Sequence, residues 1–160
     1  MIARAVLAAV LWAIACTMPA AQEDRVVAIV VSVGEGASRA DTVQAHLQAI
    51  GAETLRSAEP NNAEMRSILK RFAAEAQNAA VSLVYLDVPV VLLDGREFAL
   101  PANTSLRRHS DLFTRAVPLS AFARAAAQAA NGAAVIVAVG TARQDLPTGL
   151  QQAESAPDGL

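Results

Sequence analysis

Hydrophobic positions divide the chain into strand-length runs separated by stretches with helical spacing. The first run, RVVAIVVSV, is β-branched and apolar on both faces, which is typical of a parallel strand covered by helices on both sides. A shorter and more polar run follows, and two further apolar runs come later. The expected strands are Arg25–Val33, Glu53–Ser57, Val81–Val88 and Ala134–Val139.

The first expected helix follows the break at Gly34-Glu35-Gly36 and ends at Gly51. Ser38 and Asp41 form a weak capping box at its start. Its apolar face has the spacing i, i+3, i+4, i+7. That face is expected to consist of Val43, His46, Leu47 and Ile50.

Two more helices are predicted, and the first has the longest apolar stripe in the chain. It begins at Asn61, which Glu64 completes as a capping box, and it closes at Asn78. Its stripe is Met65, Ile68, Leu69, Phe72, Ala73 and Ala76. The other helix is Ala-rich, spans Leu119–Ala130 and turns Phe122 inward.

Strands that alternate with helices predict an α/β fold with a mostly parallel sheet and right-handed crossovers. Binding and catalytic sites of such sheets lie at the carboxyl ends of the strands. The sequence places Gly34-Glu35-Gly36, Asp87-Val88-Pro89 and Gly140-Thr141 at these ends.

The stretch VYLDVPVVLLDGREFALP, residues 84–101, combines the end of the third strand with a hairpin. Asp94-Gly95 is a typical two-residue hairpin turn. Pro89 separates the two parts, and a central strand does not ordinarily contain proline because the ring removes a ladder donor.

The two ends of the chain are expected to lie outside the fold. Residues 1–21 have a short positive region, an apolar core and small residues before Gln22, which predicts a secretory signal peptide and an exported, periplasmic or secreted protein. An alternative is lipoprotein processing, with a lipid anchor at Cys16. Residues 142–160 are rich in Gln, Pro, Gly and Asp and predict a disordered polar tail after a domain spanning 22–141.

Composition excludes several classes of function. Lys and Arg number 13 against 15 Asp and Glu, so no basic patch for nucleic acid is expected, and no segment predicts a transmembrane helix. Cys16 is the one cysteine, so the mature chain has no thiol for a disulfide or for catalysis. His46 is interpreted as a residue at the edge of the core, and the two histidines lack zinc-site spacing, so no metal and no cofactor are expected.

Several motifs in order resemble one known family. They are the opening strand, the pattern Ala63-Glu64-Met65 through Leu69 to Phe72, the hairpin Val91–Pro101 and the helix opening Val117-Pro118-Leu119. From Val26 to Gly140 this arrangement resembles the large-subunit half of the caspase-like cysteine peptidases, in particular the bacterial metacaspase-like branch. The resemblance implies a three-layer α/β/α sandwich with about four strands, in the order 2-1-3-4, plus a hairpin, here in truncated form.

The residues that the family uses for catalysis are missing. The family's catalytic His-Gly falls on Pro89-Val90, and its nucleophilic Cys falls near Val139-Gly140. A proline ring cannot shuttle a proton and no thiolate is present, so no catalytic residue is expected. A serine hydrolase is not expected because no G-x-S-x-G motif occurs. The resemblance therefore predicts a pseudopeptidase that acts as a binding, scaffold or regulatory module; the alternatives are a cysteine-type peptidase by ancestry and a small-ligand-binding domain.

Candidate binding residues are polar side chains at strand ends and in the loop before the last helix. They are Glu35, Asp87, Arg107, Arg108 and His109. Glu35, Asp87 and Glu97 could line one crevice, whereas the segment RRHSD could contact an anion. The alternative interpretation of each is a solvated charge. Gly34-x-Gly36 lacks the third glycine of a dinucleotide fingerprint.

The last strand is the expected protein-binding element. In the order 2-1-3-4, Ala134–Val139 lies at an edge of the sheet, and it is apolar and uncharged. Edge strands of this kind usually need a cover. We therefore expect it to pair with a second copy or with a protein partner.

Overall fold

The computed structural model describes residues 24–140 and 145–153. The predicted signal peptide over 1–21 and the lipid anchor at Cys16 lie outside the described residues, as do residues 142–144 and 154–160 of the predicted tail. The helices are α1 (Ala37–Ala49), α2 (Asn62–Ala76), α3 (Leu112–Arg115) and α4 (Leu119–Ala126), with 3-10 turns η1 (Gly34–Gly36) and η2 (His109–Asp111). The strands are β1 (Val26–Ser32), β2 (Glu53–Ala58), β3 (Val81–Leu93), β4 (Arg96–Ala99), β5 (Val117–Pro118), β6 (Gly132–Gly140) and β7 (Gln151–Gln152).

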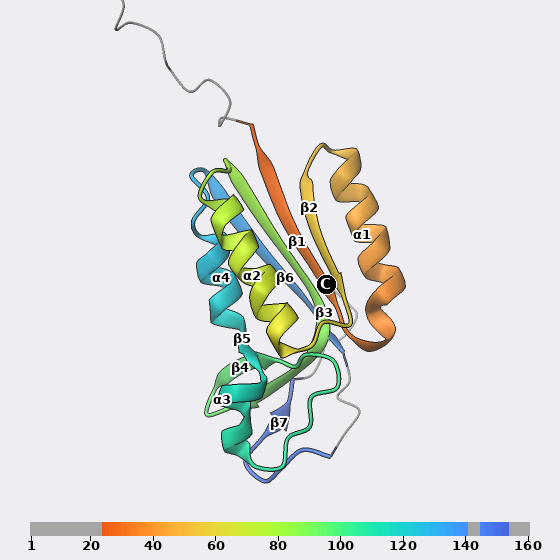
Figure 1. Cartoon of the computed structure of the whole chain (residues 1–160), viewed down its shortest axis with the longest axis vertical. Coiled ribbons are helices and arrows are strands. Elements are labelled where there is room, and N and C mark those ends of the chain that lie inside the picture. Colours follow the sequence, from red (N-terminus) through yellow and green to blue (C-terminus); the bar gives the residue numbers. More distant parts are fainter. Residues whose placement is uncertain (1–23, 141–144, 154–160) are drawn as a thin grey trace, which may run out of the picture.

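The parallel part of the sheet has the order β2-β1-β3-β6 (Figure 1). The strands β4, β5 and β7 extend the carboxyl-terminal part of β3 into a small antiparallel region. The α/β prediction is confirmed. Each parallel connection passes through a helix, as alternating strands and helices require.

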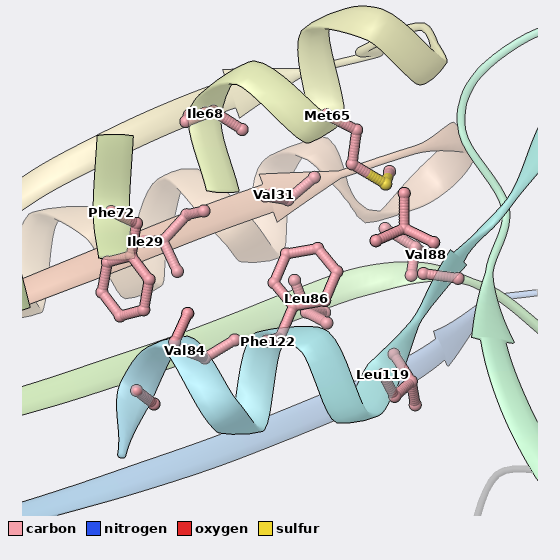
Figure 2. Packing of buried hydrophobic residues seen from close by; sticks show 14 of the residues in the cluster. Ile29, Val31, Met65, Ile68, Phe72, Val84, Leu86, Val88, Leu119 and Phe122 are labelled. Atoms are coloured by element: carbon pink, nitrogen blue, oxygen red, sulfur yellow. The ribbon is translucent and has the colours of Figure 1, made fainter. Parts of the chain in front are cut away.

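The main core lies between the sheet and the helices α2 and α4 (Figure 2). Alternate residues of β1 and β3 point into it, and Phe72 of α2 and Phe122 of α4 are fully buried there. The predicted stripe of α2 is confirmed, with Met65, Ile68, Phe72 and Ala76 buried. Asn61 caps the helix as predicted, since its Oδ1 accepts hydrogen bonds from the backbone N–H groups of Ala63 and Glu64.

Helix α1 covers the opposite face of the sheet with fewer apolar residues. Ala40 is buried against Val30 and Tyr85, and Val43 and Leu47 pack beside them. The predicted apolar face is wrong for His46 and Ile50, which are both exposed; Ile50 is 70% accessible.

The predicted Ser38–Asp41 capping box is also absent. Gly36 is the N-cap of α1 and makes no side-chain hydrogen bond. Asp41 instead accepts hydrogen bonds from the Arg56 guanidinium of β2, and this ion pair takes the place of the cap.

Strand β3 continues through Pro89, contrary to the prediction that it ends at Val88. The strand has 13 residues and changes partners at the proline: β1 pairs as far as Asp87, and β4 pairs from Val90 onward. The Pro89 carbonyl accepts a hydrogen bond from the Leu100 N–H. Pro89 is tolerated because it lies at the junction where one ladder ends and another begins.

The hairpin turns at Asp94 and Gly95, both with positive φ, as the Asp-Gly pair predicts. A second core lies below it, where Phe98 and Leu112 are buried together with Leu150. Leu150 precedes β7, which pairs with β3 at Val91 and Leu92. The prediction that 142–160 is disordered is therefore wrong for residues 145–153, whose few apolar side chains cover the hairpin.

Helix α4 ends at Ala126, before the predicted Ala130. The chain then returns to the sheet, where the N–H groups of Ala130 and Asn131 donate to the carbonyls of Ala79 and Ala80. This return places β6 beside β3. Within the described residues, no helix is long and apolar enough to cross a membrane.

Candidate functional site

The carboxyl ends of β3 and β6 lie side by side. Pro89 and Gly140 are Cα partners in the parallel ladder. The approach is close, since a Cβ atom placed on Gly140 would lie 3.3 Å from the backbone nitrogen of Pro89. Neither residue has an ionisable group, so this pair can supply neither a nucleophile nor a proton acceptor from its side chains.

Two residues before Pro89, the Asp87 carboxylate is buried and held by an arginine. Its side chain is 1% accessible, whereas the Arg39 side chain is 62% accessible. Nε of Arg39 donates to Oδ2 at 2.9 Å, and Nη2 donates to Oδ1 at 3.0 Å. This bidentate pair engages both carboxylate oxygens and fixes the start of α1 to the centre of the sheet.

Tyr85 and Gly36 enclose the same carboxylate. The Tyr85 hydroxyl donates to Oδ2 of Asp87 at 3.4 Å. Burial, followed by the nearby Asp87 charge, raises the pKa of Tyr85. The hydrogen bonds to Asp87 raise the pKa of Arg39. A Cβ on Gly36 would lie 2.1 Å from Cγ of Asp87, so a glycine is needed for this close approach.

Further hydrogen bonds and an ion pair lie at the ends of the neighbouring strands β1 and β2. Arg56 of β2 donates to Oγ of Ser32 at 2.8 Å and forms an ion pair with Asp41 at 2.9 Å. The N–H of Gly34 donates to Oε1 of Glu59 at 2.6 Å. Side chains and backbone of the protein itself thus occupy the place where α/β folds ordinarily bind ligands.

The predicted binding residues separate into two regions. Glu35 is exposed in η1, next to Gly36, which lies against Asp87. Arg107, Arg108 and His109 are exposed in the loop below the hairpin. The structure therefore does not gather the predicted residues into one site.

In that loop, the arginine backbones have a structural role. The N–H groups of Arg107 and Arg108 donate to Oδ2 of Asp111 at 2.9 and 3.1 Å. These bonds hold the pKa of Asp111 below its usual range. Asp111 in turn orders the segment before α3.

The described residues provide no alternative reactive cluster. They contain no group of three His, Cys, Asp or Glu side chains that could hold a metal ion. Every buried side-chain nitrogen and oxygen among them has a hydrogen-bond partner. Hydrogen-bonded polar groups at these strand ends stabilise the fold.

A groove of about 450 Å³ lies between α2 and α4, a feature that the sequence interpretation missed. Its apolar floor includes Leu69 and Ala121, and Arg66, Lys70 and Arg124 surround it. The Arg66 guanidinium donates to Asn62 and to the carbonyl of Ala116. Within the described residues, none of the three cations forms an ion pair with a carboxylate.

The two edges of the parallel sheet differ in charge. At the β2 edge, Glu53 pairs with Arg25 at 2.7 Å, and that hydrogen-bonded arginine lowers the pKa of Glu53. Arg56 extends this charged border. Charged side chains of this kind discourage the pairing of edges.

The β6 edge has no such protection. Its nine residues, GAAVIVAVG, contain no charge and no proline. Among the described strands, β6 pairs with β3 alone, and we call its other side the outer edge. Val135 and Ile136 are 39% and 58% accessible, although both are large and apolar. The predicted edge position of Ala134–Val139 is therefore confirmed within the described residues, whereas its partner stays a prediction.

Sequence reasoning missed Arg39 as the partner of Asp87. A detectable signal is its position three residues after Gly36, in the first turn of the helix that follows β1, where it can reach the end of the central strand.

No protein-family model matches the chain, and no curated protein matches it significantly.

Proposed function

We propose that this chain is a non-catalytic association module on a caspase-like α/β scaffold, and that it binds protein by strand addition at the outer edge of β6. The observation that carries the proposal is the exposed, uncharged character of this nine-residue edge strand. An added strand gains backbone hydrogen bonds along β6, while side chains on both faces of the strand supply specificity.

The contrast between the two sheet edges supports this assignment. The β2 edge has Glu53 and Arg56, both in ion pairs, which oppose the addition of a strand. The exposed residues of β6 are alanine, valine and isoleucine. A soluble domain seldom leaves such a strand uncovered unless a partner covers it.

The proposed ancestry is supported by the order β2-β1-β3-β6 and by the hairpin that follows β3, which agree with the arrangement implied by the resemblance. The non-catalytic part is supported by the resemblance, which assigns the family's His to Pro89 and its Cys to a position near Gly140; these two residues are Cα partners in the sheet. The Asp87 carboxylate, two residues before Pro89 in β3, has both oxygens bound to Arg39.

A hydrolysis assay tests the non-catalytic part. The purified chain is incubated with fluorogenic peptides that have Arg, Lys or Asp before the scissile bond, with and without calcium. We expect no turnover above buffer. Turnover that copurifies with the chain and is lost on substitution of a serine or histidine would overturn this part.

The groove between α2 and α4 favours a second candidate function, the binding of a small anionic amphiphile. Arg66, Lys70 and Arg124 would pair with the anion, and the apolar floor would contact its hydrocarbon part. Thermal unfolding with a panel of fatty-acid-like anions tests it. A rise in Tm that Arg124→Glu removes would support it, and an unchanged Tm across the panel would exclude it.

A further inference from the structure

We infer that the strand added to β6 is β6 of a second copy of this chain, paired antiparallel around a twofold axis at Ile136. The inference rests on the proposed function and specifies its partner and its register. It follows from the symmetry of the strand sequence and from its exposure in the fold.

Symmetry limits the registers that are available. Two identical antiparallel neighbours in one sheet are related by a twofold axis perpendicular to that sheet, so one residue must lie opposite its own copy. Gly132–Gly140 is centred on Ile136, and a twofold axis there pairs the whole of the nine-residue strand. An axis at Val135 or Val137 leaves residues at one end without a partner.

The sequence around Ile136 is nearly the same in both directions. The register at Ile136 pairs Gly132 with Gly140, Ala133 with Val139, Ala134 with Ala138, and Val135 with Val137. Residues of similar size thus face each other, no charge opposes a like charge, and each helical layer continues on its own side of the joined sheet.

The expected stabilisation comes from two sources. Half of the facing pairs in an antiparallel ladder exchange two hydrogen bonds, so nine pairs supply about eight to ten. Pairing also covers the exposed side chains of Val135 and Ile136. The product is a continuous sheet in which each copy contributes β2-β1-β3-β6, with the charged β2 strands at its two outer ends.

The first test measures the oligomeric state by sedimentation velocity. We expect the full chain to dimerise, and Ile136→Lys to weaken the dimer about tenfold or more, since two lysines then face each other. Ile50→Lys is the matched control, because Ile50 is also an exposed isoleucine but lies at the end of α1. It should leave dimerisation unchanged.

A charge exchange makes the test specific to the centre of the interface. A 1:1 mixture of Ile136→Lys and Ile136→Glu should recover dimers, because lysine then faces glutamate across the axis. A dimer that Ile136→Lys leaves intact would place the interface elsewhere and overturn the inference.

Cysteine pairing tests the register, in a Cys16→Ser background. Ile136→Cys should form a disulfide with its own copy under mild oxidation, since facing Cβ atoms lie about 5 Å apart. Ala134→Cys should not, because the two copies of residue 134 are offset by four positions, roughly 14 Å along the strand. A mixture of Ala134→Cys and Ala138→Cys should again cross-link.

Three further outcomes would overturn the inference: a monomer at all concentrations, cross-linking at residue 134 equal to that at residue 136, or open-ended aggregates in place of dimers. Each leaves the hydrolysis result untouched, so the failure of this inference is distinguishable from the failure of the non-catalytic proposal. A monomer whose β6 amides become protected by a different protein would retain strand addition and exclude the second copy.

Discussion

Pro89 of β3 and Gly140 of β6 face each other at the carboxyl ends of the parallel strands, where α/β proteins ordinarily place reactive side chains. Strand β3 passes through Pro89 from its parallel pairing into the hairpin. Gly140 allows the backbones of β3 and β6 to approach closely there. Both residues have a structural explanation in the geometry of the sheet.

Gly36 should tolerate no larger residue. In Gly36→Ala the added Cβ would overlap the Asp87 carboxylate, so either η1 or the carboxylate must move. We expect the free energy of unfolding, measured in urea, to fall by about 2–3 kcal/mol. Gly132→Ala is the control, because nothing lies within 4 Å of its Cβ position; it should change stability by less than about 0.5 kcal/mol. Equal losses in the two variants would contradict the account of Gly36.

Arg39 should stabilise the fold through Asp87. Arg39→Ala leaves a buried carboxylate without its bidentate partner, and we expect the free energy of unfolding, measured by chemical denaturation, to fall below that of the wild type. The cost should stay below that of a fully buried pair because the arginine is largely exposed to water. Arg39→Lys should recover part of the loss, whereas Arg71→Ala, at an exposed arginine of α2, should cost little. An Arg39→Ala variant as stable as the wild type would refute the structural role.

Tyr85 should ionise above its ordinary pKa of 10.0, because burial and the Asp87 charge both disfavour the phenolate. The chain has one tyrosine, so ultraviolet absorbance titration reports this group alone. The folded pKa is the higher one, so the stability that depends on it is complete below pH 10.0 and is lost as the pH rises through the folded pKa. Asp87→Asn should lower the pKa of Tyr85, because the Asp87 charge is one of the causes that raise it. A tyrosine that titrates as in a free peptide would contradict the packing described for it.

The sequence predicts the regular part of this fold well. The β-branched run of β1 and the apolar stripe of α2 determine their elements by local pattern, and Asp94-Gly95 determines the hairpin turn. The edge position of β6 is expected from the strand order 2-1-3-4 that the resemblance implies, and the observed order β2-β1-β3-β6 agrees with it.

The errors arise where tertiary contacts override local pattern. Asp41 leaves the predicted capping box because Arg56, on a strand distant in sequence, offers an ion pair. Leu150 orders part of a polar tail because the hairpin presents an apolar surface to it. Pairing of Arg39 with Asp87 likewise joins residues 48 positions apart, so the position of Arg39 in the first turn of α1 indicates that it can reach the strand end but does not identify Asp87 as its partner.

The association of β6 is tested most directly by hydrogen-exchange mass spectrometry over a series of protein concentrations. We predict that protection of residues 132–140 rises with concentration, because pairing engages the N–H groups that face outward from β6. Residues 53–58 of β2, at the charged edge, should exchange at a constant rate, and Ile136→Lys should remove the concentration dependence at β6. Rapid exchange along 132–140 that is the same at every concentration would contradict the account.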